Sequence, residues 1–524
     1  MQSKTLFWSA GAVLLVLSFG FQGVRGIWQP DEGYYIGTAV NMDLNRDYLV
    51  PRLGEEIFLD KPPLLYWGIL AGLKLFGYSE FSARFFLGLC YALTCLTVFE
   101  LGRSFTGRLQ DGFSAAMVYA TMILPFSAAN FLTMDTPLTL FTTLSMAAFW
   151  KSTRPKEPRK TLWKILLCAA VGLGFLTKGP AVLIPCGAMF VYLLVRREVM
   201  AYLRGWWLPA GILVFALLGF SWYLFVSLRI PGAAKYLFIS QVWGRLVSDA
   251  YQRNPGLKGA LIYLPVLLLG TLPWSVEWFR HPDGIRRFFR WEGWKRLTAN
   301  PSSLFLACWI CVPMTVLTLA SSKLGLYALP VFPALALASA RLIPAWFEKS
   351  TWILSPEGRK GLAFAAIWCV LLLGVRAGMG FVPIRNDCRA LWEELKPYLP
   401  SGQYEIAAVG ERVDGLWFYG AMEVENISRD DTPYPAFMLS ETMEEEVQEM
   451  REDVFPHLFL LPNSKSLPKI KTALERSGWR IEEIPLLHGR RLLICTPPEN
   501  RLEVVQPVDS SSASSFSKPA ASAE

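Results

Sequence analysis

The chain has 524 residues, of which 53% are hydrophobic and only 18% are charged. Its mean hydropathy is positive, and such a composition excludes an ordinary soluble protein of this length. The formal net charge of +8 does not call for a nucleic-acid partner, because the basic residues gather in short loops between apolar runs. The sequence therefore predicts an α-helical polytopic membrane protein.

Apolar runs of membrane-spanning length recur from residue 7 to about residue 381. The first run follows a single Lys4 and has no clear small-residue cleavage site, so we interpret it as a retained helix rather than a signal peptide. The runs predict about eleven transmembrane helices. These are expected at residues 7–24, 80–103, 112–128, 133–150, 162–177, 180–195, 206–228, 259–277, 302–320, 325–343 and 362–381.

The loops between these runs differ in charge. One set is rich in Lys and Arg and comprises RSFTGRLQD, KSTRPKEPRK, RREVMAYLRG, RHPDGIRRFFRWEGWKR and residues 341–360. The opposite set, which includes PFSAANFLT, TKGP and SSKLG, is nearly bare of positive charge. The positive-inside rule places the basic set in the cytoplasm, and an odd number of helices then places the C-terminus outside.

Two external loops interrupt this pattern. Residues 25–79 contain two short amphipathic segments, about 31–43 and 62–77, which we expect to form helices at the membrane interface. Residues 229–258 form the second loop. Its basic side chains are Arg229, Lys235, Arg245, Arg253 and Lys258.

From about residue 385 the composition becomes that of a soluble domain. The segments EIAAVG, HLFLLP, WRIEEI and RLLICT read as strands, and CRALWEELKPYL and SLPKIKTALERSGW read as helices. We therefore divide the chain into a membrane domain over 1–384, a small α/β domain over 385–500 and a low-complexity, disordered tail over 501–524.

The nine cysteines lie mostly in apolar runs. Cys308 and Cys311 form a CxxC pair within such a run, which favours a core role over a redox or metal site. Cys388 and Cys495 both belong to the soluble domain and could pair in an oxidising compartment.

Ionisable residues mark the external ends of several segments. IWQPDEGYY places Asp31 and Glu32 just after the first run, LDKPPLLYW places Asp60 and Lys61 before an apolar stretch, and FLTMDTPLTL places Asp135 at a helix end. The predicted topology brings all of them to one side of the membrane at a similar depth. Each alone could cap a helix or anchor it at the headgroups, but charges at the membrane boundary are costly unless they are paired or functional.

These residue types suit a defined chemistry. A lysine supported by arginines suits a phosphate, and a carboxylate beside it suits a general base that deprotonates an acceptor. None of the three histidines, at 281, 457 and 488, lies near these carboxylates in sequence, so no histidine metal site or triad is predicted. GLGFLTKGP lacks the P-loop spacing, so no nucleotide site is predicted either.

Two other functions compete with this interpretation. A transporter or flippase would use the same charges as ion or substrate sites, but transporters place such groups near the bilayer midplane, whereas these gather at one face. A scaffold protein would use residues 385–500 as its working module, yet about eleven spans exceed what an anchor needs.

Several motifs also carry a resemblance to a known family. PDEGYY, LDKPPLLYW, FLTMDTP, LTKGP, YLPVLLLGTLPW and SSKLGLYALPVFP follow the order seen in polyprenyl-phosphate-dependent glycosyltransferases of the GT-C fold. The chain resembles the bacterial aminoarabinose transferases that modify lipid A and, more distantly, the protein O-mannosyltransferases. The resemblance covers about residues 5–345.

This resemblance implies a multi-spanning enzyme of the bacterial inner membrane, monomeric, with its active site and C-terminal domain on the periplasmic side. It would move a sugar from undecaprenyl or dolichyl phosphate to lipid A or another envelope glycan. A protein O-mannosyltransferase-like activity is the alternative. The expected partners are the lipid-linked donor, a lipid or glycan acceptor and membrane lipids.

The resemblance also implies roles for single residues. The expected catalytic acids are Asp31, Glu32 and Asp135. The expected donor-phosphate ligands are Lys61, Arg245 and Tyr327, with supporting roles for Asp60 and Lys323.

Three departures from the aminoarabinose transferases affect this expectation. Those enzymes carry Glu where this chain has Asp60, Tyr where it has Phe58, and His where it has Val242. A divalent metal held by that histidine and the acid is therefore not expected, no cofactor is assigned, and the sugar stays open.

Overall fold

The computed structural model describes residues 2–54, 56–244, 254–281, 291–342, 356–420, 424–427, 443–450, 453–463, 467–476 and 478–497. It forms two compact units, Met1–Ile384 and Arg385–Glu524. Each unit has its own core, so each is described by itself.

The first unit is helical apart from a two-stranded hairpin. Its elements are α1 (Gln2–Phe19), α2 (Asp31–Leu44), β1 (Arg52–Leu53), β2 (Glu56–Ile57), α3 (Leu64–Phe76), α4 (Glu80–Thr106), α5 (Leu109–Thr121), α6 (Ile123–Ala128), α7 (Asp135–Ser152), α8 (Lys160–Lys178), η1 (Gly179–Val182), α9 (Leu183–Arg196), α10 (Val199–Leu203), α11 (Trp207–Phe215), η2 (Ala216–Phe220), α12 (Ser221–Arg229), η3 (Lys235–Gly244), α14 (Gly256–Ala260), α15 (Tyr263–Gly270), α16 (Ser275–Arg280), α18 (Trp291–Ala299), α19 (Pro301–Leu319), η5 (Gly325–Val331), α20 (Phe332–Ala340), α21 (Pro356–Gly378) and η7 (Met379–Phe381).

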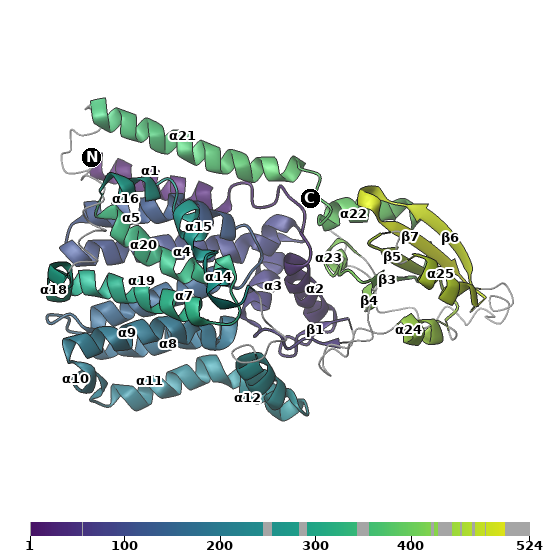
Figure 1. Cartoon of the computed structure of the whole chain (residues 1–524), viewed down its shortest axis with the longest axis horizontal. Helices are drawn as coiled ribbons and strands as arrows, with labels where there is room; N and C mark the ends of the chain where they lie inside the picture. Colours follow the sequence, from purple (N-terminus) through teal and green to yellow (C-terminus); the bar gives the residue numbers. More distant parts are fainter. Residues whose placement is uncertain are drawn as a thin grey trace. The chain divides into compact units, whose positions relative to one another are not determined.

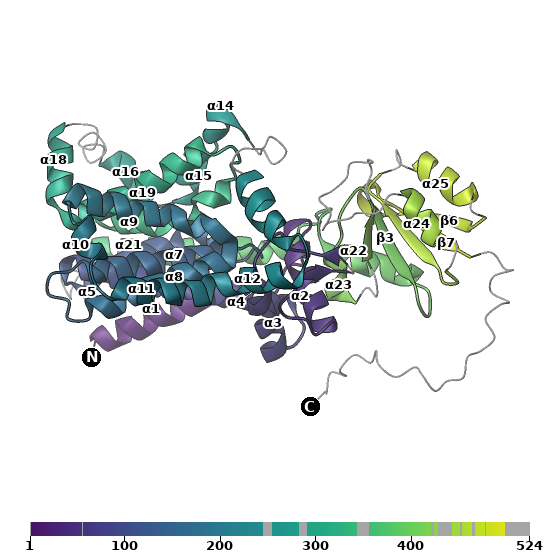
Figure 2. The same ribbon diagram turned by 90° about the horizontal axis from the view of Figure 1, so that it is seen from below.

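The long helices pack along their lengths, with α7 against α4 and α8 and with α9 against α19. Figure 1 shows α2, α3 and β1 together at one end of this bundle and α10 and α18 at the other, and Figure 2 shows the same separation from a second direction. The buried core between the helices includes the aromatic group Trp150, Phe305 and Trp309. One end of the bundle therefore carries both expected interface helices.

Local sequence signals set several helix ends. Ser79 caps α4 by accepting a hydrogen bond from the Ser82 amide at 3.2 Å, and Gly107 ends the helix with a φ of 82°. Asn300 caps α19 in the same way, with Pro301 in its first turn. Pro63 immediately precedes α3, as the prolines of LDKPP predict.

The prediction of about eleven spans is not confirmed as a count. Among the described residues, five helices are long and apolar enough to cross a membrane, and four shorter apolar helices accompany them. The five are Glu80–Thr106, Lys160–Arg196, Trp207–Arg229, Pro301–Leu319 and Arg359–Phe381. Two separately expected spans, 162–177 and 180–195, belong to one of these segments, where η1 interrupts it.

Other expected spans are broken. The segment 112–128 divides at Met122 into α5 and α6, and 259–277 divides into α14, α15 and α16. Pro273 stands in the gap before α16, where it has no backbone N–H to continue a helix. Hydropathy alone registers an apolar run but not such a break, because the residues on both sides of the break are apolar.

The second unit is a five-stranded mixed sheet with helices. Its elements are α22 (Cys388–Leu395), η8 (Lys396–Tyr398), β3 (Glu405–Val409), α23 (Leu416–Tyr419), β4 (Val424–Ile427), α24 (Met443–Glu449), β5 (His457–Leu461), α25 (Leu467–Arg476), β6 (Arg480–Pro485), η9 (Leu487–Gly489) and β7 (Arg491–Thr496). The strand order is β4-β3-β5-β7-β6, with β3 parallel to β4 and β5, and with β7 antiparallel to β5 and β6.

The four expected strands of this unit are present, and β4 is an additional one. The sequence VENI of β4 has polar residues at both central positions, so it shows no apolar run to predict a strand. Cys388 and Cys495, whose pairing the sequence left open, are both buried free thiols in the structure. The expected tail 501–524 lies outside the described residues.

Candidate active site

The two acidic residues that follow the first helix begin α2 and differ in exposure. Asp31 is the first residue of the helix and is exposed, whereas its neighbour Glu32 is 1% exposed. Consecutive helical residues point in directions about 100° apart, so the two carboxylates face different surroundings. The helix dipole favours both acids in this first turn.

Glu32 accepts six hydrogen bonds from its surroundings. Arg25 donates two, at 2.5 and 2.8 Å, and Arg84 donates two more, at 3.2 and 3.0 Å. The backbone amides of Trp28 and Leu132 each donate one at 2.9 Å. The carboxylate thus ties together the chain after α1, helix α4 and the connection from α6 to α7.

The protonation of Glu32 follows from these contacts. Burial raises the pKa of the carboxyl, but the charges and hydrogen bonds of Arg25 and Arg84 outweigh that effect and lower the pKa to about 2. A carboxylate that is ionised at neutral pH and has both oxygens engaged favours a positioning role for Glu32 over the expected catalytic role. Its effect is to fix Asp31 at the start of α2.

Asp60 and Lys61 form an ion pair with each other at the entrance to α3. The Lys61 ammonium also donates to the Asp60 carbonyl oxygen at 3.1 Å. The two side chains are 23% and 12% exposed, so the pair is partly accessible. Phe58, where the related enzymes carry a tyrosine, is 6% exposed and stacks on Tyr34 with ring centroids 5.8 Å apart.

A second lysine–aspartate pair joins three other segments. Asp135 begins α7 and is 6% exposed, and Lys178 at the end of α8 donates to it at 2.6 Å. The Lys178 ammonium also lies 4.6 Å from the ring centroid of Tyr327 in η5. Gly179 follows with a φ of 60°, a conformation that lets α8 end at this lysine.

Lys178 was not among the site residues expected from the sequence. The motif LTKGP is part of the family resemblance, but its lysine was set aside together with the P-loop interpretation. The available signal was its position at the end of an apolar run on the same predicted side as Asp135.

The remaining expected residues have different outcomes. Lys323 is 1% exposed and donates to the carbonyl oxygen of Ala320 at 2.5 Å, so it caps the end of α19 before the turn that carries Tyr327. Arg245 lies outside the described residues, as does the side chain of Val242.

Three of the expected site carboxylates affect the pKa of the same tyrosine, Tyr35. Burial raises the pKa of Tyr35 well above its usual range, and the charges of Tyr66, Asp60, Asp135 and Asp31 raise it further, in that order. The three acids, which come from separate segments, therefore all act on one phenol. Tyr35 lies four residues after Asp31 and on the same face of α2, a spacing that sequence analysis did not use.

Comparisons with known proteins identify the family of the chain. A family model described as dolichyl-phosphate-mannose-protein mannosyltransferase matches residues 60–224. The undecaprenyl phosphate-alpha-4-amino-4-deoxy-L-arabinose arabinosyl transferase of Edwardsiella ictaluri is 30% identical over 434 residues, which cover 81% of this chain and 73% of that protein. The protein of the same name from Yersinia enterocolitica is 28% identical, with 71% of this chain and 66% of that protein covered.

The fold is also similar to a solved structure. The crystal structure of ArnT from Cupriavidus metallidurans bound to undecaprenyl phosphate matches with a TM-score of 0.74 at 19% identity, covering 94% of this chain and 99% of that one. Fold and family model together define a multi-pass membrane glycosyltransferase of the GT-C class. The chain belongs to the family of the undecaprenyl phosphate-alpha-4-amino-4-deoxy-L-arabinose arabinosyl transferases, which confirms the predicted resemblance.

Proposed function

We propose that this enzyme transfers a sugar from undecaprenyl phosphate to an extracytoplasmic acceptor, with 4-amino-4-deoxy-L-arabinose as the sugar and lipid A as the acceptor. The observation that carries the proposal is the presence of two partly accessible lysine–aspartate pairs, Lys61–Asp60 and Lys178–Asp135, at helix ends. The rise that Asp60, Asp135 and Asp31 cause in the pKa of Tyr35 supports their grouping. All of these groups come from one chain, so a monomer suffices.

Lys61 is the proposed ligand of the donor phosphate. When the bond between the sugar and the phosphate breaks, the phosphate leaves with added negative charge, and a nearby ammonium stabilises that charge. Asp60 holds the ammonium in place before the donor binds, because the two form an ion pair. The pair is partly exposed, so a phosphate oxygen has room to replace or join the carboxylate.

Lys178 is proposed to orient Asp135 and Tyr327. Its ammonium contacts both, so it fixes the first turn of α7 against η5. A charge-assisted hydrogen bond of this kind is stronger than a neutral one. The Asp135 carboxylate is then held in one position for contact with the sugar or the acceptor.

Asp31 is proposed to act on the acceptor. It is exposed at the start of α2, and the buried contacts of Glu32 hold this helix end in place. A hydroxyl acceptor would need Asp31 as a general base. A phosphate acceptor, as on lipid A, is already ionised near neutral pH, so Asp31 would then orient it or balance the charge of Lys61.

Mass spectrometry tests the reaction directly. Lipid A and envelope glycans are compared between cells with the gene deleted, cells with the wild-type gene and cells that carry Lys61→Ala. The expected result is a mass increment of one aminopentose on lipid A that only wild-type cells show. An unchanged lipid A together with a changed glycan elsewhere would reject the acceptor but keep the transferase activity.

The proposed orientation has its own test. The charge bias of the loops puts Asp31 and residues 385–500 on the periplasmic side. An alkaline phosphatase fusion after residue 500 should then be active, and a green fluorescent protein fusion at the same site should be dark. The reverse pattern would reject the orientation and the external site together.

A further inference from the structure

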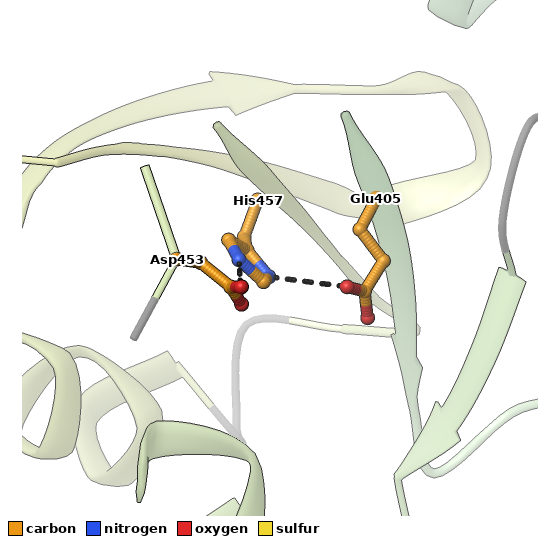
Figure 3. A group of neighbouring side chains, drawn as sticks. All are labelled: Glu405, Asp453 and His457. Atoms are coloured by element: carbon orange, nitrogen blue, oxygen red, sulfur yellow. Dashed lines mark hydrogen bonds and ion pairs between the residues drawn. The ribbon is translucent and has the colours of Figure 1, made fainter. Parts of the chain in front are cut away.

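A second group of chemically active side chains lies in the C-terminal unit, in the part of the chain that sequence analysis left without a function. Figure 3 shows Glu405, Asp453 and His457, with the imidazole between the two carboxylates. Glu405, Asp453 and His457 each offer one ligand atom within 4.8 Å of the others, and so do Glu405, Glu425 and Glu446. The sequence predicted no histidine metal site or triad, because no histidine lies near the carboxylates at the ends of the membrane segments. In the C-terminal unit, strand pairing brings His457 beside Glu405, which is distant from it in the sequence.

The register of the sheet explains this meeting. Glu405 begins β3 and His457 begins β5, and the two are directly paired across the parallel strands. Paired residues project to the same face of a sheet. Helix α24 adds Glu446 to that face, and β4 adds Glu425. Four segments thus contribute to one small volume.

The two nitrogens of the imidazole differ in their distances to the neighbouring carboxylates. Nδ1 of His457 lies 3.7 Å from Glu405 Oε2 and 3.6 Å from Glu446 Oε1, whereas Nε2 lies 3.1 Å from Asp453 Oδ2. The Nε2 distance is that of a hydrogen bond, and the two Nδ1 distances are longer than one. Two ligands bound to the same tetrahedral metal ion at about 2.0–2.2 Å stand roughly 3.3–3.6 Å apart, close to the Nδ1 distances.

Neighbouring side chains hold the His457 imidazole in an orientation that suits metal binding. Its ring stacks on Phe455 with centroids 5.0 Å apart and meets Trp479 edge-on at 5.4 Å. Nε2 lies within hydrogen-bond distance of Asp453 Oδ2. In the tautomer that carries its proton on Nε2, Asp453 accepts that hydrogen bond and Nδ1 faces the two glutamates with its lone pair. A carboxylate that orients a histidine in this way is the usual second layer of a protein metal site.

We infer that Glu405, Glu446 and Nδ1 of His457 bind a divalent transition-metal ion such as Zn²⁺, with Glu425 as the fourth ligand. Glu405 and Glu446 are 8% and 1% exposed and His457 is 2% exposed, so the ion would be enclosed on three sides, while Glu425 is half-buried. Nitrogen from histidine and oxygen from carboxylate together suit this class of metal. The ion would fasten α24 to the sheet and so stabilise the unit.

Zinc content of the full-length protein tests the site. The protein is purified in detergent, stripped with a chelator, equilibrated with ZnCl₂ and analysed by mass spectrometry of the metal. Wild type is expected to retain about one zinc per chain and to gain thermal stability with zinc, because an ion that binds only the folded state stabilises it.

Two glutamates of one helix provide a matched pair of variants. Glu446→Gln removes a proposed ligand, whereas Glu449→Gln makes the same change at an exposed position of α24. The first should lose the zinc and the second should keep it. Asp453→Asn should bind zinc about 10–100-fold more weakly, as loss of an orienting partner does. Asp60→Asn should keep the zinc, which separates this site from the active site of the first unit.

X-ray absorption on wild type covers the case that Glu446→Gln fails to fold. The expected spectrum has a shell of nitrogen and oxygen ligands near about 2.0–2.2 Å. A sulfur shell would assign the zinc to cysteine and overturn the proposal. Absence of zinc from the wild type, or equal loss from Glu446→Gln and Glu449→Gln, would overturn it as well.

Discussion

Two groups of charged side chains belong to the end of the helical unit that carries α2 and α3, and they differ in exposure. The side chains of Arg25, Glu32 and Arg84 are at most 2% exposed. Those of the pairs Asp60–Lys61 and Asp135–Lys178 range from 8% to 23%.

This difference in exposure distinguishes a group that stabilises the fold from groups that can bind a ligand. A buried carboxylate with six hydrogen bonds has no capacity left for a ligand, whereas a partly exposed pair can exchange one partner for a phosphate or a sugar. Asp31 and Glu32 show the contrast most sharply, because they are adjacent in sequence but Asp31 is exposed and Glu32 is buried. Four substitutions test the comparison.

Asp31→Asn should have the largest effect on the chemical step if the acceptor is a hydroxyl. The change keeps the size of the side chain and removes the base, so the single-turnover rate should fall by about a hundred- to ten-thousand-fold with donor binding little changed. The measurement is donor affinity and single-turnover rate in nanodiscs. If donor affinity weakens as well, Asp31 balances the charge of Lys61. Wild-type values of both quantities would remove Asp31 from the site.

Lys61→Ala should reduce transfer by about a hundred- to a thousand-fold, as loss of one electrostatic contact to a leaving group does. The amount of protein in the membrane should not change. Lys61→Arg should keep part of the activity, since the charge survives and the geometry does not. Lys74→Ala is the control, because Lys74 lies in the last turn of α3, the helix that follows Lys61, and pairs with Asp43 at 2.9 Å. Equal effects at both lysines would mean that Lys61 only anchors α3.

The main effect of Glu32→Gln should be a loss of protein stability rather than a direct loss of catalysis. Removing one partner from a buried ion pair leaves uncompensated charge and costs about 3–5 kcal/mol. Thermal unfolding in detergent should therefore begin at a clearly lower temperature than in wild type. Asp31→Asn should unfold like wild type. A Glu32→Gln protein of normal stability but without activity would indicate that Glu32 is a catalytic acid after all.

The same carboxylate predicts a pH dependence. The pKa of Glu32 is lowered from 4.5 to about 2 in the folded state, so its contribution is fully present above about pH 4.5 and is lost as the pH falls toward 2. The shift corresponds to about 3 kcal/mol. Unfolding followed between pH 5 and 2 should show this loss in wild type and a much smaller one in Glu32→Gln.

Lys178→Met should have the smallest effect, about a tenfold loss of transfer, because the lysine acts through Asp135 and Tyr327. A tenfold loss corresponds to about 1.4 kcal/mol in the transition state. Lys160→Met, at the opposite end of α8, is the matched control and should transfer normally. A loss as large as that of Lys61→Ala would indicate instead that Lys178 contacts the donor phosphate.

The sequence alone determined the class of the protein and named most of the residues in the proposed site. Apolar runs, loop charge and the motifs around Asp31, Lys61 and Asp135 predicted a helical membrane glycosyltransferase, because hydropathy and short motifs are local properties. The strands at 405–409 and 457–461 were predicted for the same reason.

Tertiary structure decided which charges share a partner. Glu32 meets Arg84 across 52 residues, Lys178 meets Asp135 across 43, and Glu405 meets His457 through strand register. Such pairs depend on how helices and strands pack, and no pattern within either segment encodes that. Local sequence patterns therefore named the residues proposed to react, while long-range packing determined which residues contact them.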